Sequence, residues 1–467
     1  MKQRPNVIFF FSDQQRWDTV GCYGQKLAVT PNLDRMAAEG VLFENAFTVQ
    51  PVCGPARACL QTGLYATQSG CYRNGISLPD TDATLANDLN RAGYQTAYVG
   101  KWHLASSMDT RYMHPNADAR QRQPADYETR AIPPERRGGY KDYWIASDLL
   151  EFTSHGYDGH VFDGDMNRVD FKGYRADRIT DFALDFIGQA DRETPFFLFI
   201  SYIEPHHQND HNRYEGPAGS QERFSGYEVP GDLVGTGGDW RENYPDYLGC
   251  CNSLDANLGR IRRKLEETGL AENTVVIYTS DHGTHFRTRN REYKRACHDG
   301  CIHIPMVVCG PGFRGGRRVD RMVSLLDIPP TILDCAGQEK PDRMQGDSLG
   351  SLAEGSVAGR EECVFLQISE SQVGRAIRTR KWKYAVRDYS KDGWKDSESD
   401  RYEEDFLYDL ENDPHEKHNL VLDPGYVPVR KELCGLLAAR MVQAGEREPV
   451  IVPAVERESR VGDTALR

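Results

Sequence analysis

Short apolar runs alternate along the chain with longer stretches in which apolar residues recur at helical spacing. Residues 7–11 form a continuous apolar run, and 95–99, 196–202 and 273–279 have the same character. Apolar runs of this kind are typical of strands that are buried on both faces of a parallel sheet.

Helical patterns separate these runs. Thr30 and Pro31 are typical of a helix start, and Gly40 of its end. Further helices are expected at 85–92, 176–189 and 244–267. The alternation predicts an α/β fold, with a large mixed, mostly parallel sheet flanked by helices.

The spacing of the expected strands and helices changes past about residue 360. Three expected strands lie close together between residues 363 and 386, and a helix is expected at 429–444. We therefore expect a catalytic α/β domain at 1–360, a smaller C-terminal α+β subdomain with an antiparallel sheet at 361–452, and a tail at 453–467. The polar stretches 106–173 and 208–242 are expected to be irregular loops that border a binding site.

Composition narrows the class of protein. The 467 residues include 57 basic and 70 acidic side chains, and the net charge of −13 argues against a nucleic-acid partner. No apolar run is long enough to span a membrane, and the first is too short for a signal peptide. The chain as it stands is expected to be cytoplasmic, or periplasmic or secreted if a leader was removed.

Polar residues of catalytic type follow four of the expected strands, namely Asp13 and Gln14, Lys101 and His103, His206 and His207, and Asp281 and His282. A single such residue is more often a helix cap or a hydrogen-bonded structural histidine. However, ligands bind beyond the carboxyl ends of strands in open α/β sheets, and four such ends together favour a site.

The residue types indicate metal-assisted chemistry on a charged substrate. One divalent cation would be bound by Asp13, Gln14, Asp281 and His282. The oxygen-rich set suits calcium, the expected ion, or magnesium, and the imidazole leaves manganese and zinc open. Positive charge and proton transfer would come from Lys101, His103, His206 and Lys294. Such a set fits a sulfate or phosphate ester.

The remaining element is a nucleophile. Residues 53–63 fit the pattern Cys-x-Pro-x-Arg-x-x-x-x-Thr-Gly, with Cys53 just before a helix expected to start at Pro55. The helix N-terminus and Arg57 are expected to lower the pKa of the Cys53 thiol. The alternative is a buried structural thiol, as expected for most of the twelve cysteines.

With this motif, the chain resembles the type I sulfatases of the alkaline-phosphatase-like superfamily. The segments 30–34, 100–103, 281–283 and 407–414 also match. The resemblance implies that a maturation enzyme converts Cys53 to formylglycine. One oxygen of the hydrated aldehyde attacks sulfur and displaces the alcohol, and the second hydroxyl is then deprotonated as sulfate leaves.

The resemblance also implies a role for each matching residue. Cys53 is the nucleophile and a metal ligand, while Arg57 and Lys101 stabilise the hydrate and the sulfate oxygens. His103 deprotonates the second hydroxyl. His206 and Lys294 hold the sulfate and assist the leaving oxygen, with the choice between His206 and its neighbour His207 left open.

Two departures leave the substrate class open. Gln14 and His282 stand where many sulfatases have aspartate and asparagine, a pattern similar to that of the phosphonate monoester hydrolase and phosphodiesterase branch. The Lys101-x-His103 pair favours a sulfatase that acts on a sulfated sugar or a small organic sulfate. The third hypothesis is that the protein is a non-catalytic, sugar-binding relative of these enzymes. Arg287, Arg289, Arg291 and Lys294 form either a site for a second anion or a solvated loop paired with nearby acids.

Overall fold

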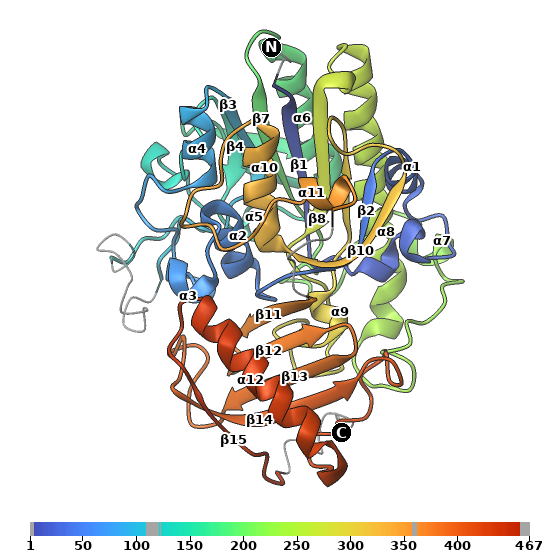
Figure 1. The fold of residues 1–467 in the computed structure, drawn as a ribbon. Coiled ribbons are helices and arrows are strands. Elements are labelled where there is room, and N and C mark those ends of the chain that lie inside the picture. Colours follow the sequence, from blue (N-terminus) through green and yellow to red (C-terminus); the bar gives the residue numbers. More distant parts are fainter. Residues whose placement is uncertain (1–3, 109–120, 122, 357–361, 458–467) are drawn as a thin grey trace.

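The computed structural model describes residues 4–108, 121, 123–356 and 362–457. Two sheets organise these residues (Figure 1). The larger sheet has ten strands in the order β10-β2-β9-β8-β1-β7-β3-β4-β5-β6, and the smaller has five strands in the order β11 to β15. The fold is therefore α/β with a separate, mostly antiparallel sheet, as expected.

The centre of the large sheet consists of the four strands that carry the expected site residues. β1 (Asn6–Asp13) lies between β7 (Phe196–Pro205) and β8 (Thr274–Ser280), and β3 (Gln95–Lys101) follows β7. All three pairings are parallel. The carboxyl ends of all four strands therefore meet at one edge of the sheet.

Alternate residues of β1 pack into two separate cores. Val7, Phe9 and Phe11 are buried on the face covered by α2 (Cys53–Thr62), α4 (Leu85–Arg91) and α10 (Ile328–Cys335). Ile8 and Phe10 are buried on the other face, with α1 (Pro31–Glu39), α6 (Arg175–Gln189) and α8 (Trp240–Glu267). Helices on both faces explain why β1 reads as a continuous apolar run.

The expectation that 106–173 is irregular was wrong for much of its described part. This stretch supplies β4 (Tyr143–Ser147), α5 (Leu150–Thr153), β5 (Asp158–Phe162) and β6 (Arg168–Lys172). β5 and β6 lie at the edge of the sheet, where half-exposed strands tolerate the polar residues that hid them in the sequence. The opposite edge holds β2 (Val41–Phe47), β9 (Met306–Cys309) and β10 (Arg317–Ser324).

The smaller sheet contains β11 (Cys363–Ile368), β12 (Val373–Thr379), β13 (Trp382–Asp388), β14 (Arg401–Asp409) and β15 (Val450–Val452). α12 (Val427–Gln443) crosses one face of it (Figure 1) and buries Leu433, Leu437 and Met441. The expected domain boundary at 360 lies outside the described residues, as does the expected tail beyond Arg457.

Short helices connect these elements: α3 (Ala66–Ser69), α7 (Ser220–Arg223), α9 (Asp299–Ile302), α11 (Gly350–Ala353) and 3-10 turns at Trp17–Thr19, Gly21–Tyr23, Pro134–Arg136, Ala271–Asn273, Leu325–Asp327 and Pro424–Tyr426. Within the described ranges, no helix is both long and apolar enough to cross a membrane.

A buried ionic cluster joins the smaller sheet to a short helix of the large domain. The Lys383 ammonium, on β13, is fully buried and pairs with Asp299 of α9 and with Glu416. Arg378 of β12 donates to the same Asp299 at 3.0 Å. The small sheet is therefore fixed to the large domain by charge as well as by apolar packing.

Candidate functional site

The backbone changes direction sharply where the central strands end. Gln14 follows β1 with φ of 71°, and His103 follows β3 with φ of 60°. Left-handed backbone at residues other than glycine is strained and concentrates at functional sites. Gly100 has φ of 108°, and a Cβ there would lie 1.9 Å from the carbonyl oxygen of Ser201. Only glycine therefore allows β3 and β7 to approach this closely just before Lys101.

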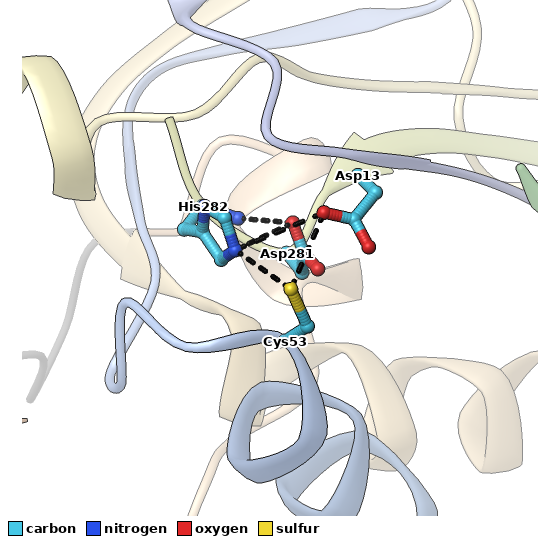
Figure 2. A group of neighbouring side chains, drawn as sticks. All are labelled: Asp13, Cys53, Asp281 and His282. Carbon is cyan, nitrogen blue, oxygen red and sulfur yellow. Dashed lines mark hydrogen bonds and ion pairs between the residues drawn. The ribbon is translucent and has the colours of Figure 1, made fainter. Parts of the chain in front are cut away.

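Four buried side chains converge beyond the strand ends (Figure 2): Asp13, Cys53, Asp281 and His282. One ligand atom from each lies within 4.8 Å of all the others. The Cys53 Sγ atom is 3.4 Å from Asp13 Oδ1 and 3.3 Å from His282 Nε2. The elements β1, α2 and the turn after β8 bring these residues together from distant parts of the chain.

The donor atoms of this cluster suit a divalent cation. Asp281 Oδ2 and Gln14 Oε1 are buried and have no hydrogen-bond partner among the described residues. The Gln14 Nε2 atom donates to the Tyr214 hydroxyl at 2.5 Å, which fixes the carboxamide. His282 Nδ1 lies 2.8 Å from the Gly283 carbonyl, so this nitrogen donates and leaves Nε2 as the acceptor. Two carboxylates, a carboxamide oxygen and a neutral imidazole thus fit the expected metal.

Two cations hold the Asp13 carboxylate. Lys101 Nζ lies 2.9 Å, and Arg57 Nη2 3.0 Å, from Asp13 Oδ2. Burial alone would raise the pKa of Asp13, but Lys101 and the other nearby cations hold it well below its usual range. Burial and the nearby Asp13 raise the pKa of Asp281 to about 7. Two carboxyl groups that are held close together have pKa values shifted in opposite directions, because their negative charges repel. A bound cation would offset this repulsion and let both carboxylates ionise.

The expectation of a lowered thiol pKa was wrong. Burial, and next the Asp13 carboxylate, raise the pKa of Cys53 to about 12 despite the opposing charges of Lys294 and Lys101. Moreover, α2 begins at Cys53 itself and not at Pro55. Since the thiolate is the reactive form of cysteine, the unmodified Cys53 side chain is a poor nucleophile in this setting.

A cavity of about 370 Å³ opens over Cys53, and Lys294, His103, His206 and His207 are among the residues that line it. Lys294 Nζ is 2.6 Å from Cys53 Sγ. The two adjacent histidine rings stack at 4.3 Å. Burial lowers the pKa of all three histidines, to about 3 for His207. The imidazoles are therefore neutral, and the choice between His206 and His207 stays open.

The sequence reasoning missed several residues of this cavity, and most come from the stretch expected to be irregular. They include Glu128, Asp148, Glu151 and Phe152, together with Asn74. Glu151 Oε1 pairs with Lys101 Nζ at 3.0 Å. Asp148 accepts from the backbone N–H groups of 104, 105 and 106 and fixes the segment after His103. Both acids follow β4, so the strand-end rule would have found them had β4 been recognised.

Of the expected basic cluster, Lys294 lines the cavity but the three arginines do not. Arg287 donates to Asn212 at 2.5 Å, and Arg289 donates to the backbone of 415 and 416. Arg291 is exposed, and none of these three arginines lines the cavity. This arrangement favours the interpretation that the three arginines belong to a loop held by local contacts and do not form a site for a second anion.

Comparison with known proteins gives a consistent result. A family model named Sulfatase matches residues 5–338, and the model for the C-terminal part of N-sulphoglucosamine sulphohydrolase matches residues 291–443. The chain is 32% identical over 464 residues to the uncharacterized sulfatase YidJ of Escherichia coli K12, covering 92% of this chain and 86% of that protein. It is 26% identical over 532 residues to an N-acetylglucosamine-6-O-sulfatase of Bacteroides thetaiotaomicron, covering 96% and 88%.

Solved structures share the fold. A protein solved in complex with its substrate D-glucosamine-2-N,6-O-disulfate superposes with a TM-score of 0.75 at 24% identity, covering 96% of this chain and 99% of that one. The phosphonate monoester hydrolase of Agrobacterium radiobacter superposes with a TM-score of 0.65 at 23% identity, covering 94% and 96%. At this identity the likeness speaks for the fold alone.

Proposed function

The chain belongs to the sulfatase family and is a sulfuric ester hydrolase, and we propose that it removes sulfate from a carbohydrate by means of a formylglycine made from Cys53 and one divalent cation. The observation that carries the proposal is the position of Cys53. It lies at the first turn of α2, beside two carboxylates, a neutral imidazole and Lys294, and it lines the cavity.

The metal would be held by Asp13, Gln14, Asp281, His282 and the modified residue 53. A divalent cation at this place supplies positive charge to the oxygens of the reacting group. Calcium is the expected ion for this oxygen-rich set, and manganese, magnesium and zinc are its competitors.

The protein's own residues have separable tasks. Lys294, 2.6 Å from the Sγ position, binds whatever oxygen replaces the sulfur. Arg57 and Lys101 keep Asp13 ionised and place two positive charges next to the sulfate site. His103 is neutral, and its buried Nδ1 has no partner among the described residues, so it is available to accept a proton. The neutral His206 ring donates from Nδ1 to the His207 carbonyl at 2.6 Å, so it would hold the sulfate and the leaving oxygen through Nε2 once that nitrogen is protonated. The negative charge of the substrate favours this protonation.

The C-terminal unit supports the site. Glu370, in the loop after β11, accepts a hydrogen bond at 2.7 Å from the backbone of Asn74, a cavity residue. It also pairs with Arg295, another cavity residue. We accordingly take 1–360 as the catalytic domain, 361–452 as a subdomain that braces one side of the cavity, and 453–467 as a tail.

The first test is the mass of the peptide that contains Cys53, from protein made in a host with a formylglycine-generating enzyme. We expect the aldehyde or its hydrate at position 53 and an unmodified thiol at Cys59, a buried cysteine of the same helix. An unmodified Cys53 in that host would leave the protein without its nucleophile and would favour the hypothesis of a non-catalytic sugar-binding protein.

A substitution tests the same point by activity. Cys53→Ala should abolish sulfate release, because alanine at the position that lines the cavity supplies no sulfur for conversion to the aldehyde. Cys59→Ala, which changes a buried thiol one turn or more away on α2, should retain turnover. Equal activity of Cys53→Ala and the parent would contradict the mechanism.

A phosphonate or phosphodiester substrate is the competing function, favoured by the Gln14 and His282 pair at the metal cluster. Values of kcat/KM on matched aryl sulfate and aryl phosphonate esters separate the two. We expect the sulfate to be preferred, and a higher value on the phosphonate would move the enzyme to the other branch.

A further inference from the structure

We propose that Glu128, Glu151 and Phe152 form a sugar-binding wall, and that this wall selects a sulfated sugar that carries hydrogen-bond donors, and above all a protonated amine, next to the ester and no second anionic group. This inference rests on the proposed sulfatase function and deepens it, since it names the class of sugar. Glu151 and Phe152 lie on α5, Glu128 lies in the chain before β4, and all three line the cavity.

Phe152 supplies the apolar part of the wall. Its side chain is 50% exposed, whereas most phenylalanines of the described chain are buried, and it borders the cavity. An exposed phenyl ring at the mouth of a cavity is a surface that a ligand can cover. The C–H face of a pyranose ring has the flat, apolar character that such a ring binds.

Glu151 supplies a fixed acceptor. Its side chain is only 4% exposed, and Oε1 is committed to Lys101 at 3.0 Å. Oε2 is buried and has no hydrogen-bond partner among the residues that the structure describes, although Glu151 lines the cavity. A buried carboxylate oxygen without a donor is costly, so a hydroxyl or ammonium donor of the substrate would satisfy it.

The charges around the cavity explain the exclusion of a second anion. Among the described residues that line it, two are lysine or arginine, namely Lys294 and Arg295. Lys294 is at the reacting centre, beside Cys53, and Arg295 is paired with Glu370 and, at 3.2 Å, with Glu292. The lining histidines are neutral because burial lowers their pKa values.

The acidic groups are less well neutralised. Asp148 is covered by backbone and hydroxyl donors of 104–106, and Glu151 is paired with Lys101. Glu128 also lines the cavity and forms no ion pair with a described residue. Burial, and next the neighbouring Asp126, raise the pKa of Glu128, as close carboxylates do. A sulfate or carboxylate on the sugar would meet this charge, whereas an ammonium would be attracted to it.

The test uses three matched monosaccharides that carry the same sulfate ester: one neutral, one with a protonated amine and one with that amine N-sulfated. For the mature enzyme we expect kcat/KM to be highest for the amine and at least about tenfold lower for the N-sulfated sugar. The difference should shrink as ionic strength rises.

Two variants assign the effect to the wall. Glu128→Gln should raise the ratio of kcat/KM for the N-sulfated to the amino sugar by about threefold or more. The control Glu135→Gln, which changes an exposed acid away from this cavity, should leave that ratio as in the parent. Phe152→Ala should raise KM for the neutral sugar about fivefold, Phe152→Tyr should restore it, and Met166→Ala, an equally exposed residue elsewhere, should change nothing.

The failures are distinguishable. If the N-sulfated sugar is the best substrate and Glu128→Gln leaves the ratio unchanged, the wall does not select by charge, although the chain remains a sulfatase. If the mature protein hydrolyses no sulfate ester, simple aryl sulfates included, the proposed function itself has failed.

Discussion

The ionic cluster between the small sheet and α9 allows a quantitative test of how the small sheet is held. Lys383→Met keeps the length and apolar stem of a fully buried side chain and removes its charge. Asp299 then keeps its pair with Arg378, at 3.0 Å, and Glu416 keeps the backbone N–H of Asp299, at 2.7 Å. Breaking a buried pair from one side costs about 3–5 kcal/mol, and because Arg378 remains we expect about 3 kcal/mol of lost stability at pH 8.

Urea unfolding followed by circular dichroism and by tryptophan fluorescence would measure this loss. Lys381→Met is the matched control, because Lys381 lies two residues away and pairs with Glu411 on the surface. The control should unfold like the parent. A loss below about 1 kcal/mol for Lys383→Met, or a loss equal to that of the control, would refute the view that this charge fixes the small sheet.

The loss should depend on pH in a defined direction. Although burial alone would raise the pKa of Asp299, Arg378 and then Lys383 lower it, whereas burial raises the pKa of Glu416 despite Lys383. Removing Lys383 shifts both folded-state pKa values upward, so the variant is penalised where both acids are ionised. The deficit should therefore be largest at pH 8 and shrink as the pH falls and Glu416 takes up a proton. A deficit that grows on acidification would contradict this assignment.

Three further predictions concern the site. Asp13→Asn should lower the divalent metal retained after dialysis, measured by elemental analysis, because it removes a buried anionic ligand; an unchanged metal content would exclude this residue as a ligand. Lys294→Met should reduce kcat/KM by at least about 100-fold without lowering the melting temperature, since the lysine faces the reacting atom; parallel losses of both would indicate a structural role. Gly100→Ala should destabilise the protein by more than about 3 kcal/mol in thermal unfolding, because its Cβ would meet Ser201, whereas Gly312→Ala, also at positive φ but with open space around it, should cost about 1 kcal/mol.

Local pattern was enough to predict the centre of the fold. The run 7–11 and the three runs like it are buried strands because helices cover both faces of the sheet, and continuous apolar sequence is the direct trace of that burial. Since parallel strands end at one edge, the residues that follow them could be assigned to one site by sequence position alone. Asp13, Asp281 and His282, three members of the buried cluster, lie at the ends of β1 and β8.

The edge of the sheet was hidden for the converse reason. β5 and β6 pair at the rim and face solvent, so their sequences lack the apolar run that marked the central strands. With β4 unrecognised, the acids Asp148 and Glu151 that follow it were missed, and so was the pairing of Glu151 with Lys101. Strand pairing across the chain, which local sequence does not encode, decided these contacts.

The sequence by itself determined which chemical groups the protein has and which strands present them, because strand burial and strand-end position are properties of short segments. The tertiary structure alone decided how those groups behave. The pKa of Cys53 is raised and not lowered, because full burial next to Asp13 outweighs the nearby cations. Burial and charge are sums over neighbours that lie far apart in the chain, as with Lys294 and Cys53, and only the folded protein brings those neighbours together.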